Sequence, residues 1–365
     1  MICRPTFRVD RSFHVDLRQA LPLFYEILID AWGFAAKITL LRKSMAKYRH
    51  DLPHRHGGTF LTDGGQATQL IFHDGVDLPH FAAFTLLDSE AGRERLKKYY
   101  EPYLDIARRY GVGFVLSGPT WRANPDWAQK LGYDSAALDA INKDSISFLE
   151  DLRAIWEASC DSSQMPCVIN GVIGPRGDGY KAGIMDADEA EAYHNEQIAS
   201  FVDSEADIVS AFTLTNIHEA IGIVRAADRQ KIPCAISFTV EMNGRLPKGE
   251  TLQQAIETVD HETNGAAEYF MINCAHPAHF EQALDSRAEW TKRLCGIRAN
   301  ASTRSHAELD ESETLDDGDP QDLGLRYRRL RTAFPGMRII GGCCGTDHRH
   351  VAAIAAACLP IDVED

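Results

Sequence analysis

The sequence carries no excess of positive charge: 38 lysine and arginine residues stand against 53 aspartate and glutamate residues, a formal net charge of −15 over 365 residues. Phosphate surfaces are bound through basic patches, so neither a nucleic acid nor an anionic membrane is an expected partner. Long apolar runs are lacking as well, because Glu26, Asp30 and Lys37 interrupt the stretch from Ala20 to Leu41. No secretory signal is recognisable. We therefore expect a cytoplasmic protein without a transmembrane helix.

The composition is that of a globular protein with a substantial core, at 44% hydrophobic and 25% charged residues. Its nine cysteines are better interpreted as reduced thiols or metal ligands than as disulfides. A small molecule is the expected partner. The oligomeric state is open, with a homo-oligomer among the alternatives.

Two regions are expected. Residues 1–50 do not share the pattern that follows, and we interpret them as an N-terminal extension without an assigned role. In residues 51–365, short apolar segments alternate with stretches of helical periodicity, such as Ala190 to Val202 and Glu219 to Ala227. Strand followed by helix, eight times over, predicts one α/β domain, a (β/α)8 TIM barrel. The strand candidates are Thr59 to Thr62, Gly113 to Ser117, Cys167 to Gly171, Asp207 to Phe212, Cys234 to Val240, Tyr269 to Asn273, Cys295 to Arg298 and Arg338 to Gly341.

An acidic run from Glu308 to Asp322 follows the seventh strand candidate. It is predicted to be a solvated loop, and a divalent-cation site is the less favoured alternative.

Three cysteines follow two of the predicted strands. Cys343 and Cys344 lie among glycines after the eighth strand, and Cys274 follows the sixth. Barrel active sites lie at the carboxyl ends of the strands, so these thiols should meet on one rim. Three thiolates suit Zn²⁺, whose fourth position in a catalytic site is left for water or substrate. Thr346 is predicted to cap the following helix.

Two other interpretations of these thiols are a redox disulfide between the neighbours Cys343 and Cys344, and simple core packing. His276 and His279 are interpreted as ordinary loop histidines. Burial explains five further cysteines, namely Cys160, Cys167, Cys234, Cys295 and Cys358.

At these residues the sequence resembles the zinc-dependent homocysteine S-methyltransferase family. Its members carry an Asn-Cys after the sixth strand and a Gly-Gly-Cys-Cys-Gly-Thr after the eighth, which stand here as Asn273-Cys274 and Gly341 to Thr346. The resemblance runs from about Phe60 to about Cys358. It includes Asp63-Gly64-Gly65 after the first strand and Arg298-Ala299-Asn300-Ala301 after the seventh.

The resemblance implies a barrel in which zinc binds homocysteine through its sulfur and the Asp-Gly-Gly segment holds the polar end of the amino acid. A free thiol has a pKa of about 8.5, and zinc coordination displaces its proton to give the nucleophilic thiolate. The methyl donor must carry its methyl group on an activated centre, as S-methylmethionine and betaine do.

The sequence departs from the family after the fourth strand. Where members commonly have Phe-Glu-Thr, whose glutamate meets the amino group of the substrate, this chain has Ala211-Phe212-Thr213. Glu241, after the fifth strand, is a candidate replacement, and a solvent-facing glutamate is the equal alternative.

The sequence therefore predicts a zinc-dependent S-methyltransferase that moves a methyl group to homocysteine or a related thiol, giving methionine or another thioether. The alternatives are a zinc hydrolase with metal-bound water and a non-catalytic zinc or thiol-redox barrel. The predicted metal ligands are Cys274, Cys343 and Cys344. The predicted substrate-binding residues are Asp63, Gly64, Gly65, Thr68, Asn170 and Asn273, with Thr120, Asn216 and Asn300 as weaker candidates for lining the pocket.

Overall fold

The protein is described from a computed structural model, which covers residues 46–161, 163–312 and 314–359. By contacts the chain divides into residues 1–45 and a second unit that begins at Ala46, and the fold below is that of the second unit. The prediction for residues 1–50 falls mostly outside the described residues. Those of the segment that are described bond to the barrel: the backbone amide of Tyr48 donates to Asp207, and the Arg49 guanidinium donates to four backbone carbonyls.

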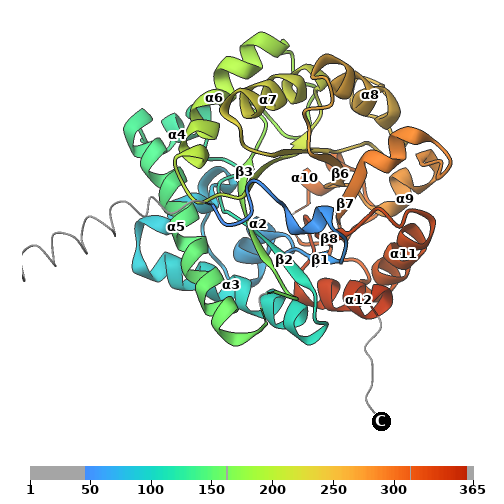
Figure 1. Ribbon diagram of the computed structural model, residues 1–365, viewed down its shortest axis with the longest axis horizontal. Helices are drawn as coiled ribbons and strands as arrows, with labels where there is room; N and C mark the ends of the chain where they lie inside the picture. The colour runs from blue at the N-terminus through green and yellow to red at the C-terminus, as the bar shows by residue number, and fades with distance from the viewer. Residues whose placement is uncertain (1–45, 162, 313, 360–365) are drawn as a thin grey trace, which may run out of the picture. The chain divides into compact units, whose positions relative to one another are not determined.

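Eight parallel strands close into a barrel in chain order, and helices surround it (Figure 1). Closure is made by β1 and β8, where Phe60 pairs with Ile339 and Leu61 with Ile340. The predicted (β/α)8 barrel is confirmed. The strands are β1 (Phe60–Leu61), β2 (Gly113–Ser117), β3 (Cys167–Ile173), β4 (Ile208–Leu214), β5 (Cys234–Phe238), β6 (Tyr269–Asn273), β7 (Leu294–Ala299) and β8 (Ile339–Gly342).

All the described α-helices except α2 begin at polar caps, as in α5, where Asp134 accepts from the amide of Ala137, and α8, where Thr251 and Gln254 form a capping box. The α-helices are α2 (Gln66–Thr68), α3 (Glu90–Arg109), α4 (Pro125–Lys130), α5 (Ser135–Ser159), α6 (Ala187–Val202), α7 (Ile217–Gln230), α8 (Leu252–Glu262), α9 (Pro277–Phe280), α10 (His306–Asp310), α11 (Pro320–Ala333) and α12 (His348–Cys358). The short 3-10 helices are η1 (Pro53–Arg55), η3 (Pro79–Phe81), η4 (Ala83–Asp88), η5 (Glu281–Ala283) and η6 (Glu289–Arg293), and η2 (Gln69–His73) is a short π-helix.

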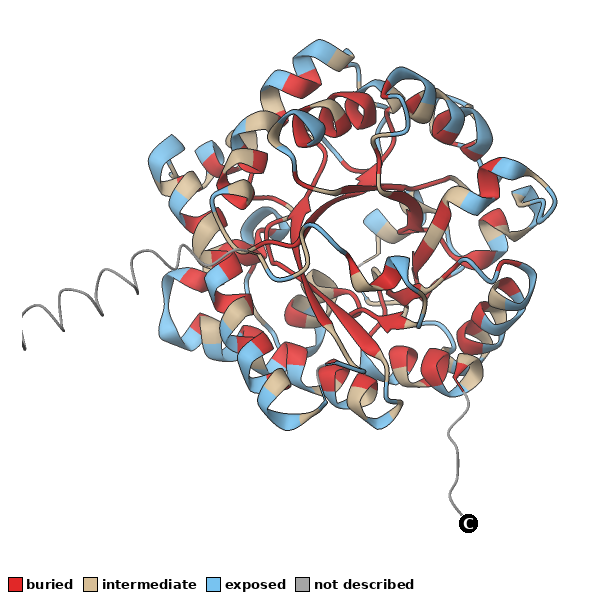
Figure 2. Cartoon of the chain, viewed as in Figure 1, coloured by how far each residue is buried: buried red, intermediate tan, exposed pale blue. Residues whose placement is uncertain are grey.

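Two apolar clusters form the core, because successive strand side chains point to opposite faces. The larger lies between the strands and the helices and includes Leu61, Phe114 and Ile169. The smaller includes alternating strand residues such as Val168 and Val172 of β3, which fill the barrel interior. Figure 2 shows the strands buried and the outer faces of the helices exposed. Among the described residues, no helix combines the length and the apolarity needed to cross a membrane.

The acidic run after β7 is not the simple loop predicted from its charge. Ser305 and Glu308 form a capping box that begins α10, and Asp319 caps α11. Asp316 and Asp317 accept from Ser302 and Arg349, respectively. The prediction of a loop is therefore wrong for residues 308–310 and 320–322, because acidic side chains of this run hold the backbone amides at the helix starts.

Candidate active site

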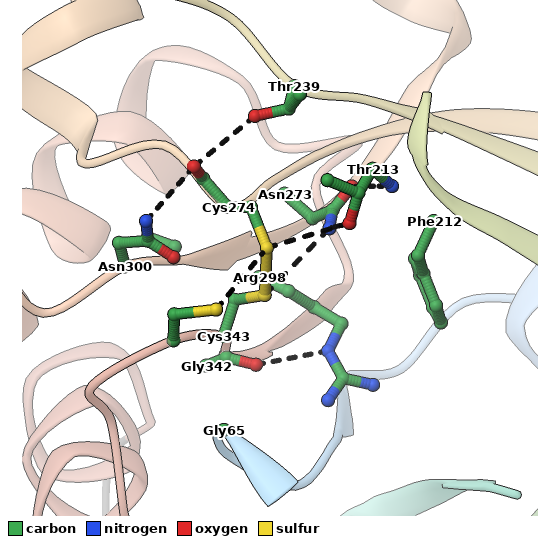
Figure 3. Close-up of a disulfide and its surroundings, with 12 residues drawn as sticks. Gly65, Phe212, Thr213, Thr239, Asn273, Cys274, Arg298, Asn300, Gly342 and Cys343 are labelled. Atoms are coloured by element: carbon green, nitrogen blue, oxygen red, sulfur yellow. Dashed lines mark hydrogen bonds between the residues drawn. A yellow bond between two sulfur atoms is a disulfide. The ribbon is translucent and has the colours of Figure 1, made fainter. Parts of the chain in front are cut away.

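Three cysteines meet where β6 and β8 end. The sulfur atoms of Cys274, Cys343 and Cys344 all lie within 4.8 Å of one another. Cys274 and Cys343 are joined by a disulfide, and Cys344 Sγ lies 3.8 Å from Cys274 Sγ (Figure 3). The structure thus pairs Cys343 with Cys274 across the barrel rim, and not with its neighbour Cys344 as the alternative redox interpretation had it.

The backbone at Cys274 adopts an unusual conformation. Its φ of 52° lies in the left-handed region, which residues other than glycine rarely occupy. Its carbonyl oxygen accepts hydrogen bonds from the Thr239 hydroxyl at 3.2 Å and the Asn300 amide at 3.0 Å, and His306 Nε2 lies 2.6 Å away. These contacts from the ends of β5 and β7 hold the turn that aims the thiol toward the β8 loop.

Asn273 joins three strand ends beside the thiols. Its side-chain oxygen accepts from the backbone amide of Thr213 at 2.9 Å and from the Ser237 hydroxyl at 2.6 Å. Its amide nitrogen donates to the Thr213 hydroxyl at 2.9 Å and lies 3.8 Å from Cys343 Sγ. Asn273 was predicted to bind substrate, and each of these four contacts is with a protein group beside the cysteine cluster.

The segment after β1 lies directly against the cysteine loop. The amide of Gly65 donates to Thr346, and the Thr68 hydroxyl accepts from the amide of Gly345 at 3.1 Å. A side chain at Gly65 would place its Cβ 2.5 Å from the carbonyl oxygen of Cys343. Gly64 is equally confined, because its Cβ would lie 2.9 Å from the carbonyl oxygen of Thr346. The structure therefore brings Gly64, Gly65 and Thr68 to the metal-ligand candidates.

Asp63 is buried and already has two partners. Its Oδ1 lies 2.8 Å from Nη2 of Arg298, and its Oδ2 accepts from the Tyr99 hydroxyl at 2.8 Å. Burial raises the pKa of Asp63, and the Arg298 charge and the Tyr99 hydrogen bond oppose that rise. Asp63 is thus within the site, but as half of a buried ion pair.

Asn170 lies on the same side of the barrel interior as this ion pair. Its side-chain nitrogen donates to the Ser117 hydroxyl at 3.1 Å, and Ser117 also accepts from Nη1 of Arg298 at 3.3 Å. The side-chain oxygen of Asn170 is buried and has no hydrogen-bond partner in the part of the chain that the structure describes. Among the predicted substrate-binding residues, Asn170 therefore has a polar atom left for a ligand.

Several weaker candidates serve the framework. The Thr120 hydroxyl donates to the carbonyl of Val172, Asn216 caps α7, and Asn300 holds Cys274 as described. His276 caps α9, and His279 lies against the carbonyl of Thr303.

The cap of α12 differs by one residue from the prediction. Asp347 is the cap, accepting from the amide of Arg349, whereas the Thr346 hydroxyl donates to the carbonyl of Cys343 at 2.6 Å. Thr346 lies where the chain is still turning out of β8, so its hydroxyl reaches the cysteine loop before the helix starts.

Three site residues were given no role from the sequence. They are Arg298, Tyr99 and Tyr180, whose hydroxyl lies 3.5 Å from Cys344 Sγ. The sequence does place Arg298 at the end of an apolar strand candidate, and a cation at that position could have indicated a site residue. The two tyrosines offered none, because one lies in a helix and the other in a loop.

The sulfur geometry fits a metal ion. Zn–S bonds of about 2.3 Å in a tetrahedral site place sulfur atoms roughly 3.8 Å apart, which is the Cys274–Cys344 separation. The Cys274–Cys343 pair must first be reduced, because disulfide sulfurs carry no thiolate charge. Burial raises the pKa of the Cys344 thiol, so a bound cation would be needed to hold it as thiolate at neutral pH.

A closed (β/α)8 barrel with three thiols on its rim is a scaffold that can hold a metal ion. A family model described as homocysteine S-methyltransferase matches residues 60–358. The chain therefore belongs to the homocysteine S-methyltransferase family. This match confirms the class of enzyme predicted from the two cysteine motifs.

Individual relatives are distant but match over most of their length. Homocysteine S-methyltransferase 1 of Arabidopsis thaliana is 24% identical over 324 residues, 84% of this chain and 95% of the relative. The homocysteine S-methyltransferase of Escherichia coli is 24% identical over 304 residues, 81% of this chain and 94% of the relative. A crystal structure of the homocysteine methyltransferase MmuM from Escherichia coli, in its metallated form, gives a TM-score of 0.66 at 20% identity. It covers 85% of this chain and 99% of that one, and at this identity the likeness shows the fold.

Proposed function

We propose that this protein is a zinc-dependent S-methyltransferase that moves a methyl group from an activated donor, such as S-methylmethionine or betaine, to the thiolate of homocysteine or a related thiol. The observation that carries the proposal is the group of three thiols at the ends of β6 and β8. Family membership supports the reaction, and a cytoplasmic location suits thiols that must be reduced to bind a metal.

The proposed zinc ligands are Cys274, Cys343 and Cys344. When bound, zinc would lower the pKa of the acceptor thiol so that the thiolate is present at neutral pH. The chain itself keeps the ligand atoms in place: Asn273 contacts Cys343, Thr213 contacts Cys274 at 3.6 Å, and the Tyr180 hydroxyl lies against Cys344. Such contacts orient metal ligands and affect metal affinity.

The proposed substrate-binding residues are Asp63, Gly64, Gly65, Thr68, Asn170 and Asn273. The first four are supported by the hydrogen bonds and close contacts that join the β1 loop to the cysteine loop. Asn170 is supported by its unpaired buried oxygen. For Asn273 we propose an indirect part, through the placement of the thiols.

The test is metal analysis of the reduced protein together with mass-spectrometric detection of methylated product. We expect about one zinc per chain and conversion of homocysteine to methionine. Cys344→Ala should lose both zinc and transfer, whereas Cys358→Ala, at the end of α12, should keep both. Retention of zinc and activity by Cys344→Ala would contradict the ligand set.

Two other results would point to the alternative functions. Zinc without methyl transfer, but with hydrolytic activity, would favour metal-bound water. Absence of zinc from reduced protein would favour a thiol-redox role, for which the Cys274–Cys343 disulfide is the supporting observation.

A further inference from the structure

The acceptor end of the site contains a buried ion pair that leaves little negative charge for a ligand. Both carboxylate oxygens of Asp63 are in contact with a partner, Arg298 on one side and the Tyr99 hydroxyl on the other. The side chains of Asp63 and Arg298 are only 4% and 9% exposed. An ammonium group could reach Asp63 only by displacing the guanidinium, which would leave Arg298 buried without its counter-ion.

Arg298 has a donor to spare. A guanidinium carries five N–H groups. Here Nε donates to the carbonyl of Gly342 at 3.1 Å, Nη1 to the Ser117 hydroxyl at 3.3 Å, and Nη2 faces both Asp63 and the carbonyl of Gly64. Hydrogen bonds account for three N–H groups, and the second N–H group of Nη2 lies beside Asp63 Oδ1, which leaves one N–H group on Nη1 without an acceptor among the described residues. A free N–H on a buried cation favours an anionic ligand group, above all a carboxylate.

The guanidinium lies next to the thiol cluster, since the residue after its acceptor Gly342 is Cys343. Figure 3 shows it between the disulfide and Phe212, and its Cζ is 5.1 Å from the centre of the Phe212 ring. Phe212 offers only an apolar surface. Asn170 offers an unpaired amide oxygen nearby, which is neutral.

Resting on the proposed function, we propose that the acceptor site recognises the carboxylate of its thiol substrate and not an amino group. The acceptors are then small thiols with a carboxylate at the spacing found in homocysteine, with or without an α-amino group, and Arg298 is the specificity-determining residue. In the transfer, the acceptor sulfur forms the new bond to the methyl carbon. The bond to the donor's cationic sulfur or nitrogen breaks, its electron pair stays on the donor, and the thiol proton passes to solvent.

The experiment compares three thiols with one methyl donor and zinc-loaded protein. Homocysteine carries both groups, 4-mercaptobutanoate lacks only the amino group, and 3-mercaptopropylamine lacks only the carboxylate. We expect the kcat/KM for 4-mercaptobutanoate to lie within about threefold of that for homocysteine. The kcat/KM for 3-mercaptopropylamine should be lower than that for homocysteine by a factor of about 30 or more, because a hydrogen bond to a charged group is lost. A preference of about tenfold or more for homocysteine over 4-mercaptobutanoate would overturn the inference.

One substitution adds a negative charge beside Arg298. Phe212→Glu adds one carboxylate beside Arg298, so whichever carboxylate the guanidinium keeps, the other is free to bind an ammonium group. The homocysteine to 4-mercaptobutanoate ratio of kcat/KM should rise about tenfold, while Phe212→Leu should leave it unchanged. An unchanged ratio in correctly folded Phe212→Glu would count against the inference.

Glu241 is the competing carboxylate. It is partly exposed, and its Oε1 lies 3.8 Å from Nδ1 of His306. If Glu241 bound the amino group, wild-type protein would prefer homocysteine and Glu241→Gln would lose that preference, which would overturn the inference. Absence of transfer to all three thiols would instead overturn the proposed function, and the acceptor class with it.

Discussion

At the scale of single residues, the contact between Gly65 and Cys343 links the β1 loop to the proposed metal ligands. Gly65→Ala would place a methyl group 2.5 Å from the carbonyl oxygen of Cys343, so the cysteine loop must shift. We expect a folded protein with zinc affinity reduced by about tenfold or more, the effect typical of changes behind metal ligands. Competition with a chromophoric chelator measures this affinity.

The matched control for this change is Gly177→Ala. Its added Cβ would have no heavy atom within 4 Å, and Gly177 lies in the loop between β3 and α6. Zinc affinity should equal that of the wild type. Equal affinities in both variants would show that the β1 loop does not constrain Cys343.

Short motifs and long-range contacts differ in how far the sequence predicts them. The meeting of Cys274 with Cys343 and Cys344 was predictable, because parallel barrel strands end on one rim and each cysteine directly follows a strand. The pairing of Asp63 with Arg298 was not, because these residues are far apart in sequence and meet only when the barrel closes. The sequence therefore gave no sign that Asp63, the predicted anchor for the amino acid, is already paired with a cation.

At the scale of elements, apolar runs located all eight strands, with both ends correct for β2 and β6 and at least one end wrong for the other six. The run from Cys234 to Val240 is uniformly apolar or β-prone, yet β5 ends at Phe238. The Thr239 amide still donates to the carbonyl of Leu214 in β4, but the Thr239 hydroxyl donates to the carbonyl of Cys274, where the chain leaves the strand. Strand ends next to the site are set by such local partners, which hydrophobic periodicity does not encode.

The turn η1 places a buried histidine at the entrance to β1. His54 is 2% exposed, neither ring nitrogen has a hydrogen-bond partner, and the rings of Phe60 and Tyr269 contact it edge-on. Burial lowers the pKa of His54 from 6.5 to about 4. Between about pH 4 and pH 6.5, His54 is therefore neutral in the folded state and protonated in the unfolded state.

This shift predicts a loss of stability in acid. Above pH 6.5 the histidine is neutral in both states, and as the pH falls toward 4 the unfolded state gains the proton first, which costs roughly 3 kcal/mol of folding free energy. His54→Phe should flatten the fall in urea midpoint between pH 7 and pH 4.5 without removing it, because His276 is shifted in the same direction. An identical slope in the variant would rule out this origin.

At the scale of the whole molecule, closure of the barrel brings together sulfur atoms from segments 69 residues apart. The same three sulfurs can form one disulfide and a free thiol, or offer three thiolates to a metal. These two states exclude each other, because a sulfur in a disulfide is not a thiolate and so cannot act as a thiolate ligand of the metal. The redox state of the thiols should therefore control whether the proposed enzyme can bind its metal.

The prediction is tested by oxidising the zinc-loaded protein with a mild thiol oxidant. Zinc and methyl transfer should be lost together, peptide mapping should show Cys274 joined to Cys343, and a reductant with added zinc should restore both. Cys358→Ala should respond as the wild type does, because its thiol lies at the end of α12, outside the cluster. Zinc retained in fully oxidised protein would contradict the exclusion, because the barrel rim would then hold the metal with fewer than three thiolates. A cross-link between Cys343 and Cys344 would instead contradict the pairing of Cys274 with Cys343.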